Sequence, residues 1–409
     1  MPLNLLQKLE ILADAAKYDA SCVSSGGEKR KAGSGLGSVT GQGICHAFTP
    51  DGRCVSLLKI LLTNFCMYDC SYCVSRRSSN VARARFRVDE VVKLTLDLYR
   101  RNCIEGLFLS SGIARSADET MSDLVRVARA LREEHGFRGY IHLKTIPGAS
   151  PELLDEAGLY ADRLSMNVEL PAEAALEKLA PEKSPVDIKR GLARTRQQIE
   201  ASSERTRSRR KPPPYAPAGQ STQMVVGADT SSDRDILRAS SRLYASYALQ
   251  RVYYSAFSPT GHPSTYLPDK PAPLLREHRL YQADWLLRFY AFSLSDIEEA
   301  MPGGMLDLSV DPKLAWALAH REAFPVDVNR ASREMLLRVP GLGTRAVDRI
   351  IASRRHATLR LAELARLTGS LARIRPFVVT PDWRPAGLLD QERLKQRLAP
   401  QPKQLSLGL

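Results

Sequence analysis

The sequence lacks any uncharged apolar run of about eighteen residues, the length that a membrane-spanning helix needs. Its first twenty residues place a lysine and a glutamate inside an amphipathic pattern, without the basic front, apolar middle and small-residue cleavage site of a secretory signal. We therefore expect a cytoplasmic protein. Cysteine is sparse, with seven in 409 residues. In a reducing compartment such cysteines are more often metal ligands or free thiols than disulfide partners.

Acidic residues are outnumbered, so the net charge is +14. From Lys313 to the end, eighteen Lys and Arg face eight Asp and Glu, a surplus of ten. Such a surplus suits a polyanion such as nucleic acid, and it also suits a solvated basic surface. The segment 204–219 carries five basic residues within seven and then a proline cluster. It is either a solvated loop or an arm that touches phosphate.

Apolar strand patterns alternate with helix patterns through the first two thirds of the chain, after a short helix and a glycine- and serine-rich stretch within 1–50. The predicted strands are 57–63, 104–112, 140–145, 163–170, 221–227 and 251–257. The predicted helices are 88–101, 119–134, 151–160, 185–203, 233–249 and a helical stretch at 272–300. This alternation indicates a parallel sheet. Six units are too few to close an eight-stranded barrel, so the predicted fold class is α/β, an open, partial (β/α)6 TIM-like barrel.

We expect this barrel over 51–265, with functional groups at the carboxyl ends of its strands. A helical connector over 266–312, a small all-α domain over 313–385 and a loosely ordered tail over 386–409 are expected to follow.

The cysteine segment NFCMYDCSYC follows the first predicted strand at once. It places Cys66, Cys70 and Cys73 in a C-x3-C-x2-C spacing. Three thiolates can hold three irons of a [4Fe–4S] cluster and leave the fourth iron open to a small molecule. A zinc site would need a fourth protein ligand. Zinc and inert thiols remain the alternatives.

This spacing, with Tyr72 before the third cysteine, resembles the radical S-adenosylmethionine (SAM) superfamily over roughly 55–260. The resemblance implies a [4Fe–4S] cluster and SAM as cofactors, with the open iron chelating the methionine group of SAM. It also implies that one electron, from a donor such as flavodoxin or ferredoxin, cleaves SAM to a 5′-deoxyadenosyl radical. That radical would abstract hydrogen from the substrate, while the protein orients and shields it.

The resemblance also implies SAM contacts at the strand ends. These positions are Tyr72, Ser110, Ser111, Gly112, Asn167, Glu169, Val225 and Gly227. The usual acidic residue after the serine-glycine segment is absent, because Ile113 stands there, so backbone carbonyls would bind the SAM amino group. Glu169 is either a contact of the ribose or amino-acid portion or the partner of a nearby base. Lys144 and Thr145 face the same mouth with open roles, and no catalytic residue is assigned.

The other cysteines match no ligand spacing. Cys22, Cys45 and Cys54 precede the triad, and Cys45 adjoins His46. They either bind a second cluster or metal, line the substrate cavity, or are small buried side chains and free thiols. Cys103 is expected to pack at the start of the second strand.

A second pattern occupies 324–355, where two helices flank the turn VPGLG. Asn329 is expected to cap a helix over 331–338, with Glu334 in its early turns, and Thr344 begins a helix to about 354. This pattern resembles the helix-hairpin-helix module, which binds DNA phosphates through backbone N–H groups. The implied DNA contacts are Pro340, Gly341, Leu342, Gly343, Thr344, Arg345 and Arg349, with Arg354 and Arg355 nearby. The alternative is a hairpin used for packing or protein contact.

Nearly the whole chain resembles a subfamily described as DNA modification or repair radical SAM proteins. The resemblance rests on GICHAFTPDGRCVSLLKILLTNFCMYDCSYC, REHRLYQADWLLRFY and the terminal hairpin. It implies DNA as a partner, bound through its duplex backbone, and a uracil-DNA-glycosylase-like partner protein. Our leading hypothesis is therefore a radical SAM enzyme that acts on DNA. The alternatives are modification of RNA, above all transfer RNA, and a non-catalytic iron–sulfur protein that binds DNA.

Overall fold

The computed structural model describes residues 3–17, 44–48, 54–205, 214–260, 264–391 and 393–399. The chain divides into two compact units. Unit 1 comprises 1–231 and 239–272, and unit 2 comprises 232–238 and 273–409. Residues 273–312 of the predicted connector and the hairpin region both fall in unit 2. The basic segment of the predicted arm at 204–219 and the glycine- and serine-rich stretch lie largely outside the described residues.

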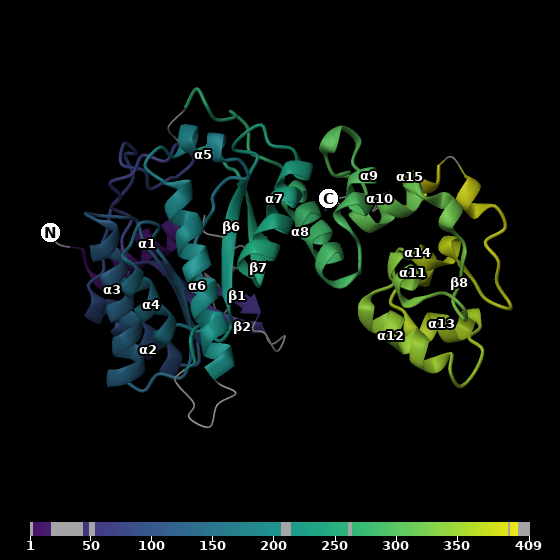
Figure 1. The fold of residues 1–409 in the computed structure, drawn as a ribbon, viewed down its shortest axis with the longest axis horizontal. Helices are drawn as coiled ribbons and strands as arrows, with labels where there is room; N and C mark the ends of the chain where they lie inside the picture. Colours follow the sequence, from purple (N-terminus) through teal and green to yellow (C-terminus); the bar gives the residue numbers. More distant parts are fainter. Residues whose placement is uncertain are drawn as a thin grey trace, which may run out of the picture. The chain divides into compact units, whose positions relative to one another are not determined.

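Unit 1 is built on one curled sheet whose seven strands follow each other in sequence order (Figure 1). The strands are β1 (Ile44–Phe48), β2 (Cys54–Leu61), β3 (Gly106–Ser110), β4 (Tyr140–Lys144), β5 (Arg163–Ser165), β6 (Gln220–Val226) and β7 (Arg251–Ala256). β2 to β7 pair in parallel, which confirms the predicted partial barrel. β1 was not predicted, and it pairs antiparallel with β2.

The strands of this sheet are buried on both faces, and β2, β3 and β4 are mainly apolar, whereas β6 buries Gln220, Ser221 and Thr222. All five residues of β3 are buried, and Leu57, Leu107, Ile141 and Leu143 are fully buried. Burial on both faces is typical of parallel strands that helices cover. The core of unit 1 therefore lies along the middle of the sheet, and the carboxyl ends of the strands are left for polar groups.

Helices line one face of the sheet side by side (Figure 1). Those of unit 1 are α1 (Leu5–Ala16), α2 (Val88–Arg100), α3 (Ala117–Arg129), η1 (Ala130–Glu134), α4 (Pro151–Tyr160), α5 (Glu173–Leu179), α6 (Pro185–Arg205) and most of α7 (Asp233–Tyr247). Ser116 caps α3 by accepting the backbone N–H of Glu119, and acidic residues occupy the first turns of α2 and α3. Such carboxylates complement the helix dipole. α1 packs against β2 instead.

The fourth predicted strand is shorter than expected. β5 ends at Ser165, whereas the apolar pattern predicts a strand to 170. Glu169 has a φ of 66°, in the left-handed region that is costly for a residue with a side chain. Its backbone still pairs with β6, since its N–H donates to the Gln223 carbonyl at 3.0 Å and its carbonyl accepts from Val225 at 2.7 Å. The strand thus ends in a bend that turns Glu169 toward the site.

Unit 2 is a set of short helices with one small parallel ladder. Its elements are α8 (Leu274–Phe289), α9 (Leu294–Glu299), η2 (Pro302–Gly304), α10 (Pro312–Ala319), η3 (Arg321–Ala323), β8 (Val326–Asp327), α11 (Arg333–Arg338), α12 (Thr344–Ser353), α13 (Leu361–Leu367), α14 (Leu371–Ile374), η4 (Arg375–Phe377), β9 (Val378–Val379), η5 (Leu388–Asp390) and α15 (Leu394–Leu398). Trp316, Phe324 and Phe377 pack edge to face in its core.

The structure adds detail to two expectations for unit 2. The stretch 272–300 is two helices, because Ala291 takes a φ of 55° and Ser293 caps α9. The tail from 386 was expected to be loosely ordered, yet its described part folds into η5 and α15 and buries Leu389 and Leu394. Across the described parts of both units, no helix combines the length and the apolar character that crossing a bilayer requires.

Candidate functional site

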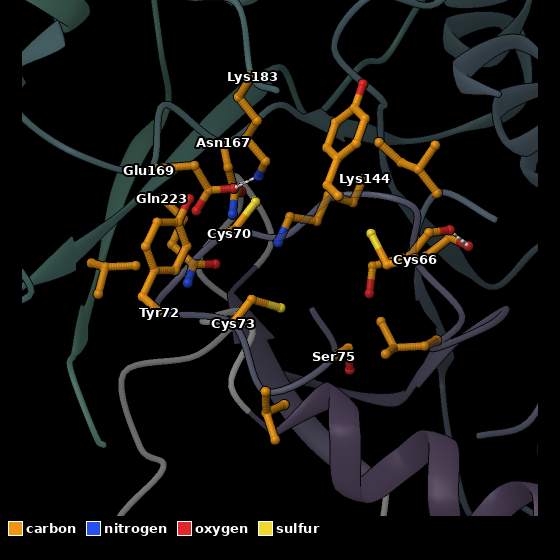
Figure 2. A pocket seen from close by; sticks show the side chains of 18 of the residues that line it. Cys66, Cys70, Tyr72, Cys73, Ser75, Lys144, Asn167, Glu169, Lys183 and Gln223 are labelled. Carbon is orange, nitrogen blue, oxygen red and sulfur yellow. Dashed lines mark hydrogen bonds and ion pairs between the residues drawn. The ribbon is translucent and has the colours of Figure 1, made fainter. Parts of the chain in front are cut away.

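One pocket lies at the carboxyl ends of the unit 1 strands, and it brings together most of the predicted site residues (Figure 2). Its lining includes Cys66, Cys70, Tyr72, Cys73, Ser110, Ser111, Gly112, Lys144, Thr145, Asn167, Glu169 and Val225. Gly227, with a φ of 79°, follows β6 and is not among the lining residues. Parallel strands place their carboxyl ends at one edge, so residues far apart in sequence meet there.

The cysteine loop is held from inside by Arg83. Its guanidinium donates to the backbone carbonyls of Asn64, Ser75, Arg76 and Ser79, at 2.8 Å to Ser75 and 2.6 Å to Arg76. A planar guanidinium with five donors can tie several carbonyls at once. The loop after β2 is therefore held in one shape by partly buried hydrogen bonds.

The three thiols occupy different environments. Cys70 is buried, while Cys66 and Cys73 are half-buried. Burial raises the pKa of the Cys70 thiol to about 12, against the opposing effect of the Lys183 ammonium. Burial likewise raises the pKa of Cys73 to about 11. Without a bound cation these thiols stay protonated at neutral pH, so thiolate ligation needs the charge of a metal group.

The arrangement suits a cluster better than a single metal ion. Within the described ranges, no three His, Cys, Asp or Glu side chains converge as ligands of one ion would. Figure 2 shows Cys70 and Cys73 on one side of the pocket and Cys66 across from them, with the Lys144 amine pointing into the space between. A [4Fe–4S] cluster binds each cysteine through a different iron, so its thiols need not meet at a point. Cys66, Cys70 and Cys73 would hold such a cluster.

Glu169 forms a buried ion pair with Lys183, whose ammonium donates to its Oε1 (Figure 2). Glu169 is 5% exposed. Burial disfavours the charged ammonium, but the Glu169 carboxylate raises the pKa of Lys183 above its ordinary value. Glu169 thus pairs with a base, and its contact with the ribose or amino-acid portion of SAM stays a prediction. Lys183 lies in the loop between α5 and α6 and was not predicted, because no spacing in the sequence links it to the strand ends.

Tyr72 borders the same pocket beside this ion pair. Its hydroxyl is buried and, among the described residues, makes no hydrogen bond of normal geometry. Burial, reinforced by the nearby Glu169 charge, raises the pKa of this phenol well above its usual range, so the hydroxyl keeps its proton. A buried hydroxyl without a partner is costly unless a ligand satisfies it. SAM carries several polar atoms, so the polar lining fits it.

Gly112 closes the other side of the pocket. A Cβ at this position would lie 2.5 Å from the Phe65 carbonyl oxygen and 3.2 Å from that of Thr63. The Gly112 N–H donates to the Thr63 carbonyl at 2.7 Å, and the Met67 N–H donates to Ile113 at 2.7 Å. The serine-glycine segment is therefore pressed against the start of the cysteine loop, where a side chain would not fit.

The remaining cysteines do not form a second site in the described structure. Cys45 is buried in a small core cluster with Val55, Leu57 and Phe108, which favours a packing role. Cys54 is exposed. Cys103 was expected to be packed, but it is exposed as well, because β3 begins three residues later at Gly106. Cys22 and the side chain of His46 lie outside the described residues.

In unit 2 the hairpin is formed by α11, the turn at 339–343 and α12. Pro340 and Leu342 are buried, whereas Gly341, Arg345 and Arg349 are exposed and Gly343 and Thr344 are half-buried. Gly341 has a φ of 91°, and Gly343 is the N-cap of α12 without a side-chain cap. The predicted set thus divides into two residues that pack inward and five that reach the surface.

Two residues of the hairpin act differently from expectation. Ser332 caps α11 by accepting the Met335 N–H at 3.1 Å, so the predicted cap at Asn329 is wrong. Asn329 instead ties the Leu359 backbone, with bonds of 3.0 and 2.8 Å. Arg354 donates to the carbonyls of Val328 and Ala331, so its guanidinium is committed to the loop before α11.

Comparison with known proteins finds one family model that matches part of the chain. The model of the Radical SAM superfamily matches residues 60–205, which contain all three pocket cysteines. The cofactors of such a domain are a [4Fe–4S] cluster and SAM. No curated protein matches the sequence.

Several solved structures resemble the chain. Methylornithine synthase shares 17% identity over 56% of this chain and 61% of its own, with a TM-score of 0.43. The FeFe-hydrogenase maturase from Carboxydothermus hydrogenoformans shares 16% sequence identity with this chain. The match covers 56% of this chain and 49% of the maturase, with a TM-score of 0.40. Coproporphyrinogen III oxidase from Escherichia coli shares 14% sequence identity with this chain. The match covers 55% of this chain and 50% of the oxidase, with a TM-score of 0.33. The chain thus spans about half the length of the solved structures it matches.

Proposed function

We propose, from the premise that residues 60–205 form a radical SAM domain, that this chain is an enzyme that modifies or repairs DNA. The observation that carries the proposal is that one chain joins the cysteine pocket to a hairpin with surface glycines and arginines. The surplus of ten positive charges beyond 312 supports a polyanionic substrate. When bound, the cluster and SAM supply a 5′-deoxyadenosyl radical.

The residues of the pocket would bind the cluster and SAM and orient them. The three cysteines hold the cluster, and the Arg83 bonds keep their loop in one conformation. Tyr72 offers its hydroxyl to a bound polar group, and Asn167 and Lys144 supply further donors from neighbouring strand ends. Because Glu169 is neutralised by Lys183, the pocket holds this carboxylate without an uncompensated charge.

The hairpin would bind the duplex backbone. Gly343 begins α12, where a helix N-terminus presents backbone N–H groups and a partial positive charge. A Cβ at Gly343 would meet only the Tyr290 hydroxyl, at 3.6 Å, so the approach to this residue is open among the described atoms. Exposed Arg345 and Arg349 would add charge. Such contacts are independent of base sequence and weaken with salt.

The test is SAM cleavage by anaerobically reconstituted, dithionite-reduced protein, measured as 5′-deoxyadenosine with and without duplex DNA. We expect formation that duplex DNA increases. Arg345→Glu/Arg349→Glu should remove the increase and weaken duplex binding by roughly tenfold or more at low salt. Arg384→Glu/Arg393→Glu is the matched control, since both arginines are exposed in the same unit.

Two outcomes would replace the proposal. Transfer RNA that competes better than duplex DNA and stimulates cleavage more strongly would make RNA the substrate. A protein that carries a full cluster and cleaves no SAM would be a non-catalytic iron–sulfur protein. The uracil-DNA-glycosylase-like partner stays a prediction, which co-purification with the tagged full chain would check.

A further inference from the structure

Lys313 is a buried cation that bonds to the turn of the hairpin in unit 2. It lies in the first turn of α10 and is 7% exposed. Its ammonium donates to the Leu342 carbonyl at 2.5 Å, which is its one hydrogen bond within the described residues. Lysine is almost never buried unless it is paired. The turn carbonyl is therefore the contact that holds this ammonium inside the unit.

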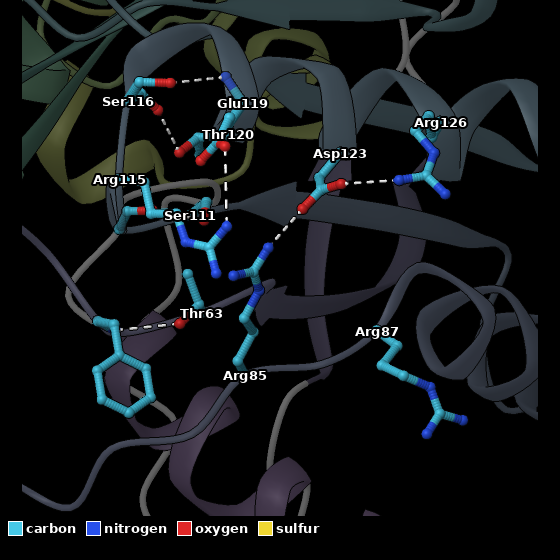
Figure 3. Close-up of polar contacts among 12 residues, drawn as sticks. Thr63, Arg85, Arg87, Ser111, Arg115, Ser116, Glu119, Thr120, Asp123 and Arg126 are labelled. Carbon is cyan, nitrogen blue, oxygen red and sulfur yellow. Dashed lines mark hydrogen bonds and ion pairs between the residues drawn. The ribbon is translucent and has the colours of Figure 1, made fainter.

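Cations at the surface of unit 1 have a different kind of partner. Beside the pocket, Arg85 and Arg126 share the Asp123 carboxylate at 2.8 and 3.1 Å (Figure 3). Arg115 lies 3.8 Å from Glu119. These arginines are 44–73% exposed, so solvent screens both members of each pair. Lys313 is shielded from solvent, and its charge acts on a peptide group instead of a carboxylate.

The Leu342 carbonyl and the Gly343 N–H belong to one peptide unit. The bond between them is trans, so the two groups point in opposite directions. A carbonyl drawn inward to Lys313 therefore aims the Gly343 N–H away from the buried ammonium. Among the described residues this N–H has no acceptor, and Gly343 begins α12 without a side-chain cap. The peptide thus offers a donor at the surface of the turn.

The ammonium also strengthens this donor. A cation at the carbonyl oxygen polarises the peptide group, and hydrogen bonds in a chain reinforce each other where solvent is excluded. The positive end of the α12 dipole lies at the same residue, Gly343. Both effects favour an anion in front of the turn, where a phosphate would bind.

We infer that Lys313 is a positioning residue of the hairpin, which aims the Gly343 N–H at a DNA phosphate and adds positive charge behind the turn. The inference rests on the proposed function, because it explains how the proposed duplex contact is built. Lys313 acts through the Leu342–Gly343 peptide and touches no phosphate itself, since it lies buried beneath the turn.

The groups that face Lys313 determine when it is charged. Asp311 caps α10 and forms an ion pair with Arg373 of α14, and the Tyr290 ring at the end of α8 lies 4.7 Å from the ammonium. Burial lowers the pKa of Lys313 to about 7, while the Asp311 carboxylate opposes this shift and the Arg373 guanidinium adds to it. The charge is present below this pH and lost above it, so duplex affinity should fall as the pH rises through about 7.

The first measurement is duplex affinity of the full chain by fluorescence anisotropy at low salt, from about pH 6 to about pH 8.5. We expect Lys313→Met to bind roughly fivefold or more weakly than wild type at the acidic end, and the two to converge at the alkaline end. Histidines titrate in the same range in both proteins, so the difference between the two profiles reports Lys313.

Two further variants separate charge from geometry. Lys395→Met is the matched control, because Lys395 lies in the same unit, is about half exposed and pairs with Asp307. It should follow the wild-type profile. Lys313→Gln keeps a neutral donor for the Leu342 carbonyl, so its affinity should lie between those of Lys313→Met and wild type, without the fall near pH 7.

A second measurement needs neither DNA nor SAM. In the full chain labelled with nitrogen-15 glycine, the amide resonance of Gly343 is the one that Gly343→Ala removes. We expect it to shift with a midpoint near pH 7 in wild type and to stay fixed in Lys313→Met, because the charge beside its peptide group changes only in wild type.

The outcomes distinguish this inference from the proposed function. Wild-type affinity and pH profile in a folded Lys313→Met would overturn the inference, and so would a Gly343 resonance that ignores both pH and the substitution. If Lys313→Met fails to fold, the profiles of wild type and Lys313→Gln decide in its place. A wild-type chain that binds no duplex would contradict the proposed function, and a titrating Gly343 resonance would then still support the positioning role of Lys313.

Discussion

The pocket of unit 1 and the hairpin of unit 2 both contain charged side chains, but these are buried in the pocket and exposed on the hairpin. In the pocket, Glu169 and Lys183 are buried and paired with each other. On the hairpin, Arg345 and Arg349 are exposed. A buried pair responds strongly to loss of one partner and weakly to salt, whereas exposed charge is screened by salt. The two regions should therefore fail separately and under different conditions.

The largest effect is expected from removal of a cluster ligand, and it should affect the pocket without affecting the hairpin. Cys70→Ala removes a cluster ligand, so we expect loss of bound iron and of 5′-deoxyadenosine down to background. Duplex DNA affinity should stay within about twofold, because Cys70 and the hairpin belong to different compact units. Iron analysis and fluorescence anisotropy with labelled duplex measure the two properties. A parallel loss of DNA affinity would contradict the separation.

A smaller effect is expected from the buried ion pair. Lys183→Met leaves Glu169 buried without its partner and should lower the free energy of unfolding by about 3–5 kcal/mol. Lys189→Met is the matched control, because Lys189 and Glu173 are about half exposed and such pairs contribute roughly 0–1 kcal/mol. Urea denaturation of the cluster-free chain measures both. The double variant Glu169→Gln/Lys183→Met should recover part of the loss, and no recovery would mean that Lys183 stabilises through packing alone.

The smallest effects are expected in the hairpin, where two glycines should behave differently. Gly341→Ala forces a left-handed backbone on a residue with a side chain and brings its Cβ to 2.9 Å from Ile374, at a cost of about 1–2 kcal/mol. Gly343→Ala has an ordinary φ and a contact of 3.6 Å, so stability should change by less than ~0.5 kcal/mol. Its duplex affinity should nevertheless fall. Thermal unfolding and anisotropy distinguish the two roles, and unchanged affinity in Gly343→Ala would count against phosphate contact there.

Local patterns predicted the barrel well, because most of its strands contain a run of apolar residues and are separated by amphipathic helices. The cysteine spacing likewise predicted three thiols that line one pocket, and their role as cluster ligands stays a prediction. β1 was missed, since ICHAF is a short edge strand next to a glycine- and serine-rich stretch. The bend at Glu169 was missed because NVEL alternates like a strand, while its pairing with β6 decides the backbone.

Residues that act through tertiary contacts were the hardest to predict. Lys183 follows Glu169 by fourteen residues, with a helix between them, and such a lysine is usually solvated. Arg354 lies at the end of α12, where sequence alone suggests a phosphate contact, but two backbone carbonyls occupy its guanidinium. Asn329 and Ser332 are both good caps, and only the fold of the preceding loop selects Ser332.

The division of α7 between the two units has a consequence for dissecting the protein. Residues 232–238 group with unit 2, and the rest of the helix groups with unit 1. Asp233, fully buried, accepts from Arg276 at 2.5 Å and from the Leu306 N–H at 2.9 Å. A fragment that ends at residue 272 would keep this carboxylate and lose both donors. The barrel therefore cannot be excised by a single cut, because part of the second unit is encoded within the sequence of the first.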